Sequence, residues 1–109
     1  MQQLTALVFV LSVVPALVNA QTVSEIIARY NSSSTTYQGL TIPYRYYVPK
    51  NYSPSNKYAI ITFLHGAGER GIDNVKQLVR TPIILANDTV QSLYKFFIVA
   101  PQVILISYS

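Results

Sequence analysis

Residues 58–71 have the sequence YAIITFLHGAGERG. Its first seven residues are almost continuously apolar, which is typical of a short strand covered on both faces of a sheet. The glycines that follow let the backbone turn sharply and bring its amide groups close to a ligand. The sequence therefore predicts a central strand over residues 58–64 that ends in a glycine-rich loop.

A second strand of this kind is predicted at residues 96–100, just before a proline. Between the two strands, residues 73–82 have apolar side chains at helical spacing behind Asp73, which is a good N-cap residue, and residues 89–94 predict a further helical turn. Strand, glycine-rich turn, helix and strand form a βαβ unit, whose two strands run parallel. The fold class predicted is therefore α/β.

The chain before this unit has a mixed pattern. Residues 23–30 predict a short helix or ordered arm, and residues 31–35 predict a polar turn. The β-branched and aromatic residues at 37–42 and 44–48 predict two short antiparallel strands, with Arg45 marking a solvent-exposed face.

Composition excludes several functions. The 109 residues carry a formal net charge of +4 at pH 7 and contain no cysteine, so disulfides and a thiol nucleophile are ruled out. Because the lysines and arginines are scattered, we expect no nucleic-acid partner. One histidine and four dispersed carboxylates lack metal-ligand spacing, so we expect no metal site and no cofactor.

The first twenty residues predict a secreted protein. An apolar run at residues 4–18 has the length of a signal-peptide core, and the small residue Ala20 precedes a predicted cleavage point. The competing interpretation is an uncleaved membrane anchor; after cleavage, no membrane association is expected. The predicted organisation is a signal peptide (1–20), an N-terminal arm or short helix (21–35), a domain segment (36–102) and a divergent apolar tail (103–109).

Three Asn-x-Ser/Thr sequons begin at Asn31, Asn51 and Asn87. Each has a non-proline middle residue and is a candidate for N-glycosylation in a eukaryotic secretory pathway. The alternative is that asparagine and serine simply favour turns.

The glycine-rich loop also supports a family resemblance. The sequence LHGAGERG at residues 64–71 is followed by Asp73 and Asn74 and later by VAPQ at residues 99–102. Together with YRYYVP at residues 44–49, these motifs resemble secreted α/β-hydrolases of the carboxylesterase group, which includes feruloyl-esterase-like, polyhydroxybutyrate-depolymerase-like and predicted-peptidase members. The resemblance implies an α/β-hydrolase fold of which this chain holds the N-terminal strands and one βαβ unit.

The resemblance also implies roles for single residues. It places the oxyanion loop at Gly66, Ala67 and Gly68, where a backbone N–H, that of Ala67 first, would meet a developing negative oxygen. The rest of the motif is His65, Glu69, Arg70 and Gly71. We expect the His65 ring to hold the loop by hydrogen bonds rather than to act as a base, and we expect Glu69 and Arg70 to be a solvated rim or to touch substrate.

The catalytic residues of the family are missing from this sequence. The family's nucleophile lies in a Gly-x-Ser-x-Gly turn, and none of the four glycines here lies two positions from a serine. The resemblance therefore implies the N-terminal fragment of a secreted ester hydrolase, inactive alone, whose full-length relative would act on a small or polymeric ester. The alternative is a non-catalytic secreted binding or interaction module derived from the same fold, so whether the chain is an enzyme stays open.

Overall fold

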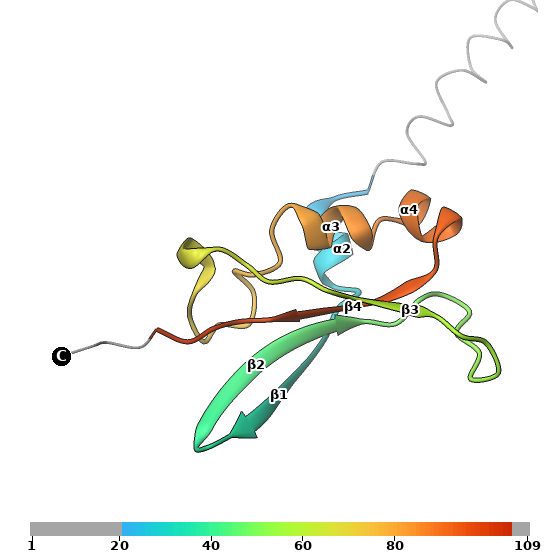
Figure 1. Ribbon diagram of the computed structural model, residues 1–109. Coiled ribbons are helices and arrows are strands. Elements are labelled where there is room, and N and C mark those ends of the chain that lie inside the picture. The colour runs from blue at the N-terminus through green and yellow to red at the C-terminus, as the bar shows by residue number, and fades with distance from the viewer. Residues whose placement is uncertain (1–20, 106–109) are drawn as a thin grey trace, which may run out of the picture.

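The computed structural model describes residues 21–105 (Figure 1). The predicted signal peptide and the end of the predicted tail lie outside these residues. In chain order, the elements are α2 (Val23–Ile27), β1 (Asn31–Tyr37), β2 (Leu40–Tyr47), β3 (Ala59–Thr62), the 3-10 helix η1 (Ala67–Glu69), α3 (Thr81–Leu85), α4 (Asp88–Leu93) and β4 (Phe96–Pro101).

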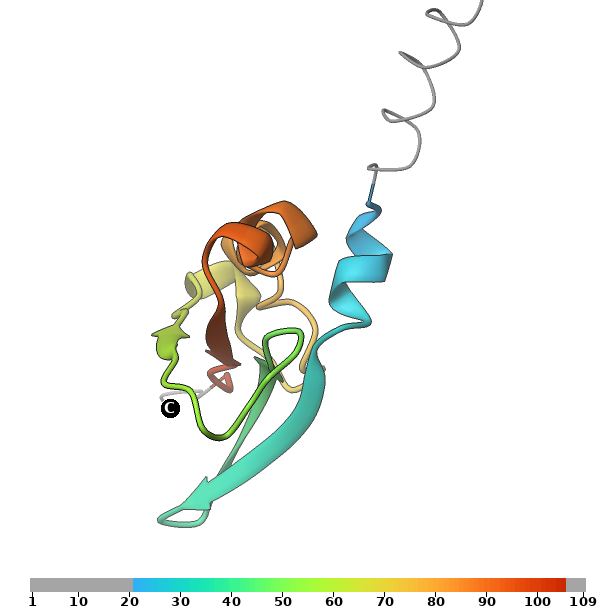
Figure 2. The same cartoon turned by 90° about the vertical axis from the view of Figure 1, so that its right-hand side faces the viewer.

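The four strands form one mixed sheet in the order β1-β2-β4-β3. β1 and β2 are antiparallel, β2 and β4 are antiparallel, and β3 and β4 are parallel. Helices α2, α3 and α4 lie on one side of this sheet (Figures 1 and 2). The predicted α/β class and the parallel pair joined through helices are confirmed.

The core lies between β4 and the helices. Burial alternates along β4, where Phe96, Ile98 and Ala100 are buried and the residues between them are half-buried. This alternation follows from the pleat of a strand, which sends successive side chains to opposite faces. The buried face packs against apolar residues of the helical layer and its flanks, including Ile26 and Leu78.

The helix near the N-terminus forms as predicted, over a shorter span. Thr22 is its N-cap: the Thr22 side chain accepts the Glu25 N–H, and the Glu25 carboxylate accepts the Thr22 N–H. This reciprocal arrangement satisfies two backbone donors that a helix start leaves unpaired. Ile26 is the residue of α2 that becomes buried.

The polar turn predicted at residues 31–35 is wrong, because these residues belong to β1. Their serine and threonine side chains are mostly exposed on an edge strand, where no core contact penalises them. The turn instead lies at Gln38 and Gly39, whose φ angles of 50° and 79° suit a tight hairpin. The two antiparallel strands predicted at residues 37–42 and 44–48 are therefore wrong as well: most of these residues form the single strand β2, whose antiparallel hairpin partner is β1.

The solvent-exposed position predicted for Arg45 is also wrong. Its side chain is half-buried, and its guanidinium donates hydrogen bonds to three backbone carbonyls, those of Ile27, Tyr30 and Asn74. Arg45 thereby ties β2 to the end of α2, to the residue before β1 and to the segment after the glycine-rich loop.

The strand predicted at residues 58–64 is shorter and more exposed than expected. β3 pairs only with β4 among the described strands, and Ile60 is 67% exposed. Its apolar sequence predicts burial on both faces, but the described residues cover neither face fully.

The helix predicted at residues 73–82 is absent from the described structure. Asn74 and Arg80 both have positive φ angles, near 56° and 58°, which interrupt a right-handed helix at each end of the segment. Pro82 lies in the first turn of α3 rather than ending a helix, in agreement with the tolerance of proline at that position.

Candidate functional site

The candidate site is the glycine loop, defined here as residues 65–71, which leaves the carboxyl end of β3. Gly66 has an extended conformation, and η1 follows it with the Glu69 N–H donating to the Gly66 carbonyl at 3.3 Å. The Arg70 side chain folds back on the loop, because its Nε donates to the Ala67 carbonyl at 2.9 Å. The loop is therefore an ordered turn held by its own polar groups.

Two backbone donors at the start of η1 are free to meet a ligand. Ala67 and Gly68 are exposed, and neither N–H has an acceptor among residues 21–105. Adjacent N–H groups at a helical turn form a concavity that favours a negative oxygen. The Ala67 and Gly68 N–H groups are therefore available to donate hydrogen bonds to a ligand oxygen.

His65 connects the glycine loop to the chain that follows β4. Its Nε2 accepts the Val103 N–H at 2.8 Å, and its Nδ1 lies 2.6 Å from the Gly66 carbonyl oxygen. A ring that accepts at Nε2 and meets a carbonyl at Nδ1 carries its proton on Nδ1. Both nitrogens are thus engaged with the backbone, and the Nε2 lone pair is not free to act as a base in this arrangement.

Gln102 clamps the other end of the glycine loop. Its fully buried side-chain amide donates to the Glu69 carbonyl at 3.0 Å and to Asp73 Oδ1 at 2.8 Å, and its Oε1 accepts the Asn74 N–H at 2.7 Å. Gly71 lies beside it with a φ of 156°, which residues with a side chain rarely adopt, and a Cβ there would also crowd Gln102 Nε2 at 3.3 Å. Sequence reasoning gave Gln102 only as part of a motif, with no role.

A signal for Gln102 was present in the sequence. It extends the alternation that buries Phe96, Ile98 and Ala100, so it falls at the next buried position of the same face. A buried amide must find hydrogen-bond partners, which the loop's backbone supplies.

Asp73 and Asn74 fix the chain after the glycine loop. Asp73 Oδ1 accepts the backbone N–H groups of Val75 and Lys76. The Val75 hydrogen bond is the largest of the effects that lower the pKa of Asp73, followed by those from Gln102 and Lys76. This carboxylate therefore stays ionised and holds a turn, and its solvent exposure argues against a raised-pKa acid role.

Asn74 reaches back to the sheet. Its Nδ2 donates to the Tyr44 carbonyl at 3.0 Å and to Ser32 Oγ at 2.9 Å, and its Oδ1 accepts from Gln77 Nε2 at 2.6 Å. The buried Gln77 also donates to the Ala100 carbonyl. Side-chain amides thus supply much of the bonding that a regular helix would have supplied here.

The candidate glycosylation sites lie apart from the glycine loop. Asn31 and Asn51 are exposed, at the start of β1 and in the turn after β2. Asn87 is the N-cap of α4, and its Oδ1 accepts the Thr89 N–H.

Within residues 21–105, no group of three or more His, Cys, Asp or Glu side chains is placed to hold a metal ion. In the same span, no helix has the length and apolar character needed to cross a bilayer.

Comparison with solved structures shows that the chain is similar to a thermostable esterase. It superposes with a TM-score of 0.69 and 38% sequence identity, over 72% of this chain and 22% of its own length. No family model matches the sequence, and no curated protein matches it. The chain thus has an esterase-like α/β fold and spans about a fifth of the length of that esterase.

Proposed function

We propose that this chain supplies the oxyanion loop of a secreted serine ester hydrolase of the carboxylesterase group. In this proposal the 109 residues are an N-terminal portion, inactive alone, and polypeptide outside them provides nucleophile, acid and base. The single observation that carries the proposal is the pair of free N–H groups of Ala67 and Gly68, presented at the end of a parallel strand in an esterase-like fold.

The chemistry assigned to the loop is electrostatic. When a serine oxygen attacks an ester carbonyl, negative charge develops on the carbonyl oxygen, and a fixed N–H stabilises that charge more than the ground state. His65 and Gln102 support this role because they fix both ends of the loop before any substrate arrives. Preorganised donors need no rearrangement at the moment of reaction.

The compartment and the substrate class belong to the same proposal. The apolar run at residues 4–18 supports secretion, and the three sequons support a glycoprotein. The substrate proposed is a small or polymeric ester, as the neighbouring esterase suggests.

The test is made on the mature product secreted from this locus, using a fluorophosphonate probe for active serines and a p-nitrophenyl ester for turnover. We expect labelling and hydrolysis, and we expect Ala67→Pro to lower kcat by about 10²–10³-fold, because it removes one N–H donor. Gly66 is already extended, so proline can follow it without strain.

Ala67→Gly is the matched control, since it alters the same position and keeps the N–H. A secreted product that neither reacts with the probe nor hydrolyses esters would overturn the proposal. That result would favour the non-catalytic secreted binding or interaction module instead.

A further inference from the structure

A second candidate site lies at the opposite end of the sheet from the glycine loop. A cavity of about 480 Å³ opens where β4 begins, and its lining comes from the turn after β2, from α4 and from the residue before β4: Lys50, Asn51, Asp88, Gln91, Ser92 and Lys95. The glycine loop instead follows the carboxyl end of β3, beside the end of β4 (Figure 1). A cavity of this size falls in the range of small-molecule sites.

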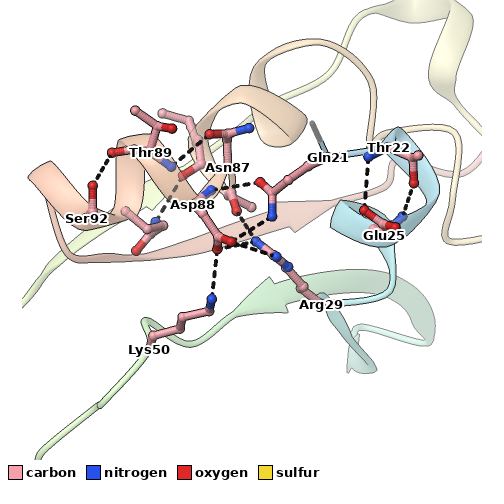
Figure 3. Close-up of polar contacts among 12 residues, drawn as sticks. Gln21, Thr22, Glu25, Arg29, Lys50, Asn87, Asp88, Thr89 and Ser92 are labelled. Atoms are coloured by element: carbon pink, nitrogen blue, oxygen red, sulfur yellow. Dashed lines mark hydrogen bonds and ion pairs between the residues drawn. The ribbon is translucent and has the colours of Figure 1, made fainter. Parts of the chain in front are cut away.

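Asp88, the one carboxylate among the lining residues, already has partners for both of its oxygens. Figure 3 shows Arg29, Lys50 and Gln21 converging on it: Oδ1 lies 2.6 Å from Arg29 Nη1 and 2.9 Å from Lys50 Nζ, and Oδ2 accepts from Gln21 Nε2 at 2.7 Å. The Arg29 hydrogen bond, followed by that of Lys50, lowers the pKa of Asp88. One ionised carboxylate is thus shared between two cations.

Lys95 adds a third cation that has no counter-ion. It lines the cavity and forms no ion pair with any residue from 21 to 105. The lining holds two lysines and one carboxylate, and that carboxylate is also paired with Arg29, so positive charge is in excess around the cavity. Like charges gathered at a concave site are stabilised by an anion that binds between them.

Neutral polar groups complete the wall. Asn51 and Ser92 contribute an exposed amide and an exposed hydroxyl. Gln91 is buried behind them: its Nε2 donates to the Leu85 and Phe96 carbonyls, and its Oε1 has no partner in the described part of the chain but lies out of reach of a ligand. Amides and hydroxyls are the groups that recognise ligand hydroxyls.

We propose that this cavity is a binding site for a small hydroxylated ligand with one oxyanion group, the oxyanion lying between Lys50 and Lys95. The oxyanion is a carboxylate or a phosphate, which share this chemistry. The site is independent of the proposed ester chemistry, because none of its lining residues belongs to the glycine loop.

The test uses saturation-transfer difference NMR on the full chain, made in a bacterial host so that Asn51 carries no glycan. The probes are glucuronate and glucose 6-phosphate, with glucose as the neutral analogue. We expect transfer to one or both anions but not to glucose, and we expect added NaCl to weaken it. A signal from only one anion identifies the head group.

Matched variants locate the site. Lys95→Gln removes the unpaired cation and should weaken binding of the anionic probe by about tenfold, whereas Lys95→Arg should keep it. Lys57→Gln makes the same charge change at an exposed residue outside the cavity and should have no effect. Equal transfer to glucose, an equal loss with Lys57→Gln, or no transfer to a chain shown to be folded by circular dichroism would overturn the proposal.

Discussion

β3 and β4 are parallel neighbours with similarly apolar sequences, yet the described structure treats them differently. β4 is paired on both sides and its inward face is fully buried, with Ile98 at 0% exposure. β3 is paired on one side, and its Ile60 is 67% exposed. A continuous apolar run therefore indicates that a segment forms a strand of the sheet. It does not indicate how deeply that strand is buried, because burial depends on which other elements cover the strand.

The same isoleucine-to-alanine change should destabilise the protein far more on β4 than on β3. Ile98→Ala should lower the free energy of unfolding by about 2–5 kcal/mol, because it leaves a cavity in the core. Ile60→Ala, the same change on β3, should cost less than about 0.5 kcal/mol, as at an exposed position. Urea unfolding of both variants measures the difference.

Similar losses from the two substitutions would contradict the comparison. They would mean that the outer surface of β3 is covered in the protein in solution.

How much of this could be predicted from the sequence follows from the same contrast. Hydrophobic pattern found both strands and their parallel pairing, because that pattern is local and strong. It missed the partial exposure of β3, because that exposure depends on whether segments far away in the sequence pack over the strand. It also missed β1, because serine and threonine on an edge strand are also typical of turns.

The candidate site divides in the same way. The glycine pattern located the loop at residues 65–71, because closely spaced glycines after an apolar run can be recognised from the sequence alone. The sequence pattern did not predict the buried or half-buried side-chain amides that hold the chain around this loop. These amides, of Gln102, Asn74 and Gln77, come from separate segments, and their partners are backbone groups brought close only by folding.

The residues that follow the carboxyl ends of β4 and β3, Gln102 and His65, should also differ in their contribution to stability. Gln102→Leu should lower the free energy of unfolding by about 1–3 kcal/mol, because it removes the fully buried amide and leaves the partly buried Glu69 carbonyl and Asn74 N–H without their partner. His65→Phe, at the end of β3, should cost about 0.5–1.5 kcal/mol, because its partners are more exposed and water can replace the ring. Thermal and urea unfolding of the two variants test this order.

Hydrogen exchange sharpens the same test by showing where each effect falls. In Gln102→Leu, the Gly71 and Asn74 amides should exchange faster, while amides of β2 should not. A larger cost for His65→Phe would mean that the β3 end, rather than the β4 end, anchors the glycine loop.

A smaller effect is expected on the pH dependence of stability, through Asp73 and its hydrogen bond from Gln102 at the end of β4. The folded-state pKa of Asp73 is lowered from its ordinary value of 3.8, chiefly by the Val75 N–H and then by Gln102. A depressed carboxyl pKa contributes stability that is fully present well above pH 3.8 and is lost as pH falls through the folded-state value. Asp88 acts in the same direction through Arg29.

Melting temperatures measured from pH 5 to pH 2 should therefore fall, and Asp73→Asn should make the fall shallower. The asparagine keeps an acceptor at Oδ1 but has no charge to lose, so its acid dependence should come from Asp88 and the remaining carboxylates. Asp88→Asn is the matched comparison at the amino end of β4. If Asp73→Asn left the slope unchanged, the Val75, Lys76 and Gln102 hydrogen bonds would not be charge-assisted, and the β4 end would be held by neutral amide contacts alone.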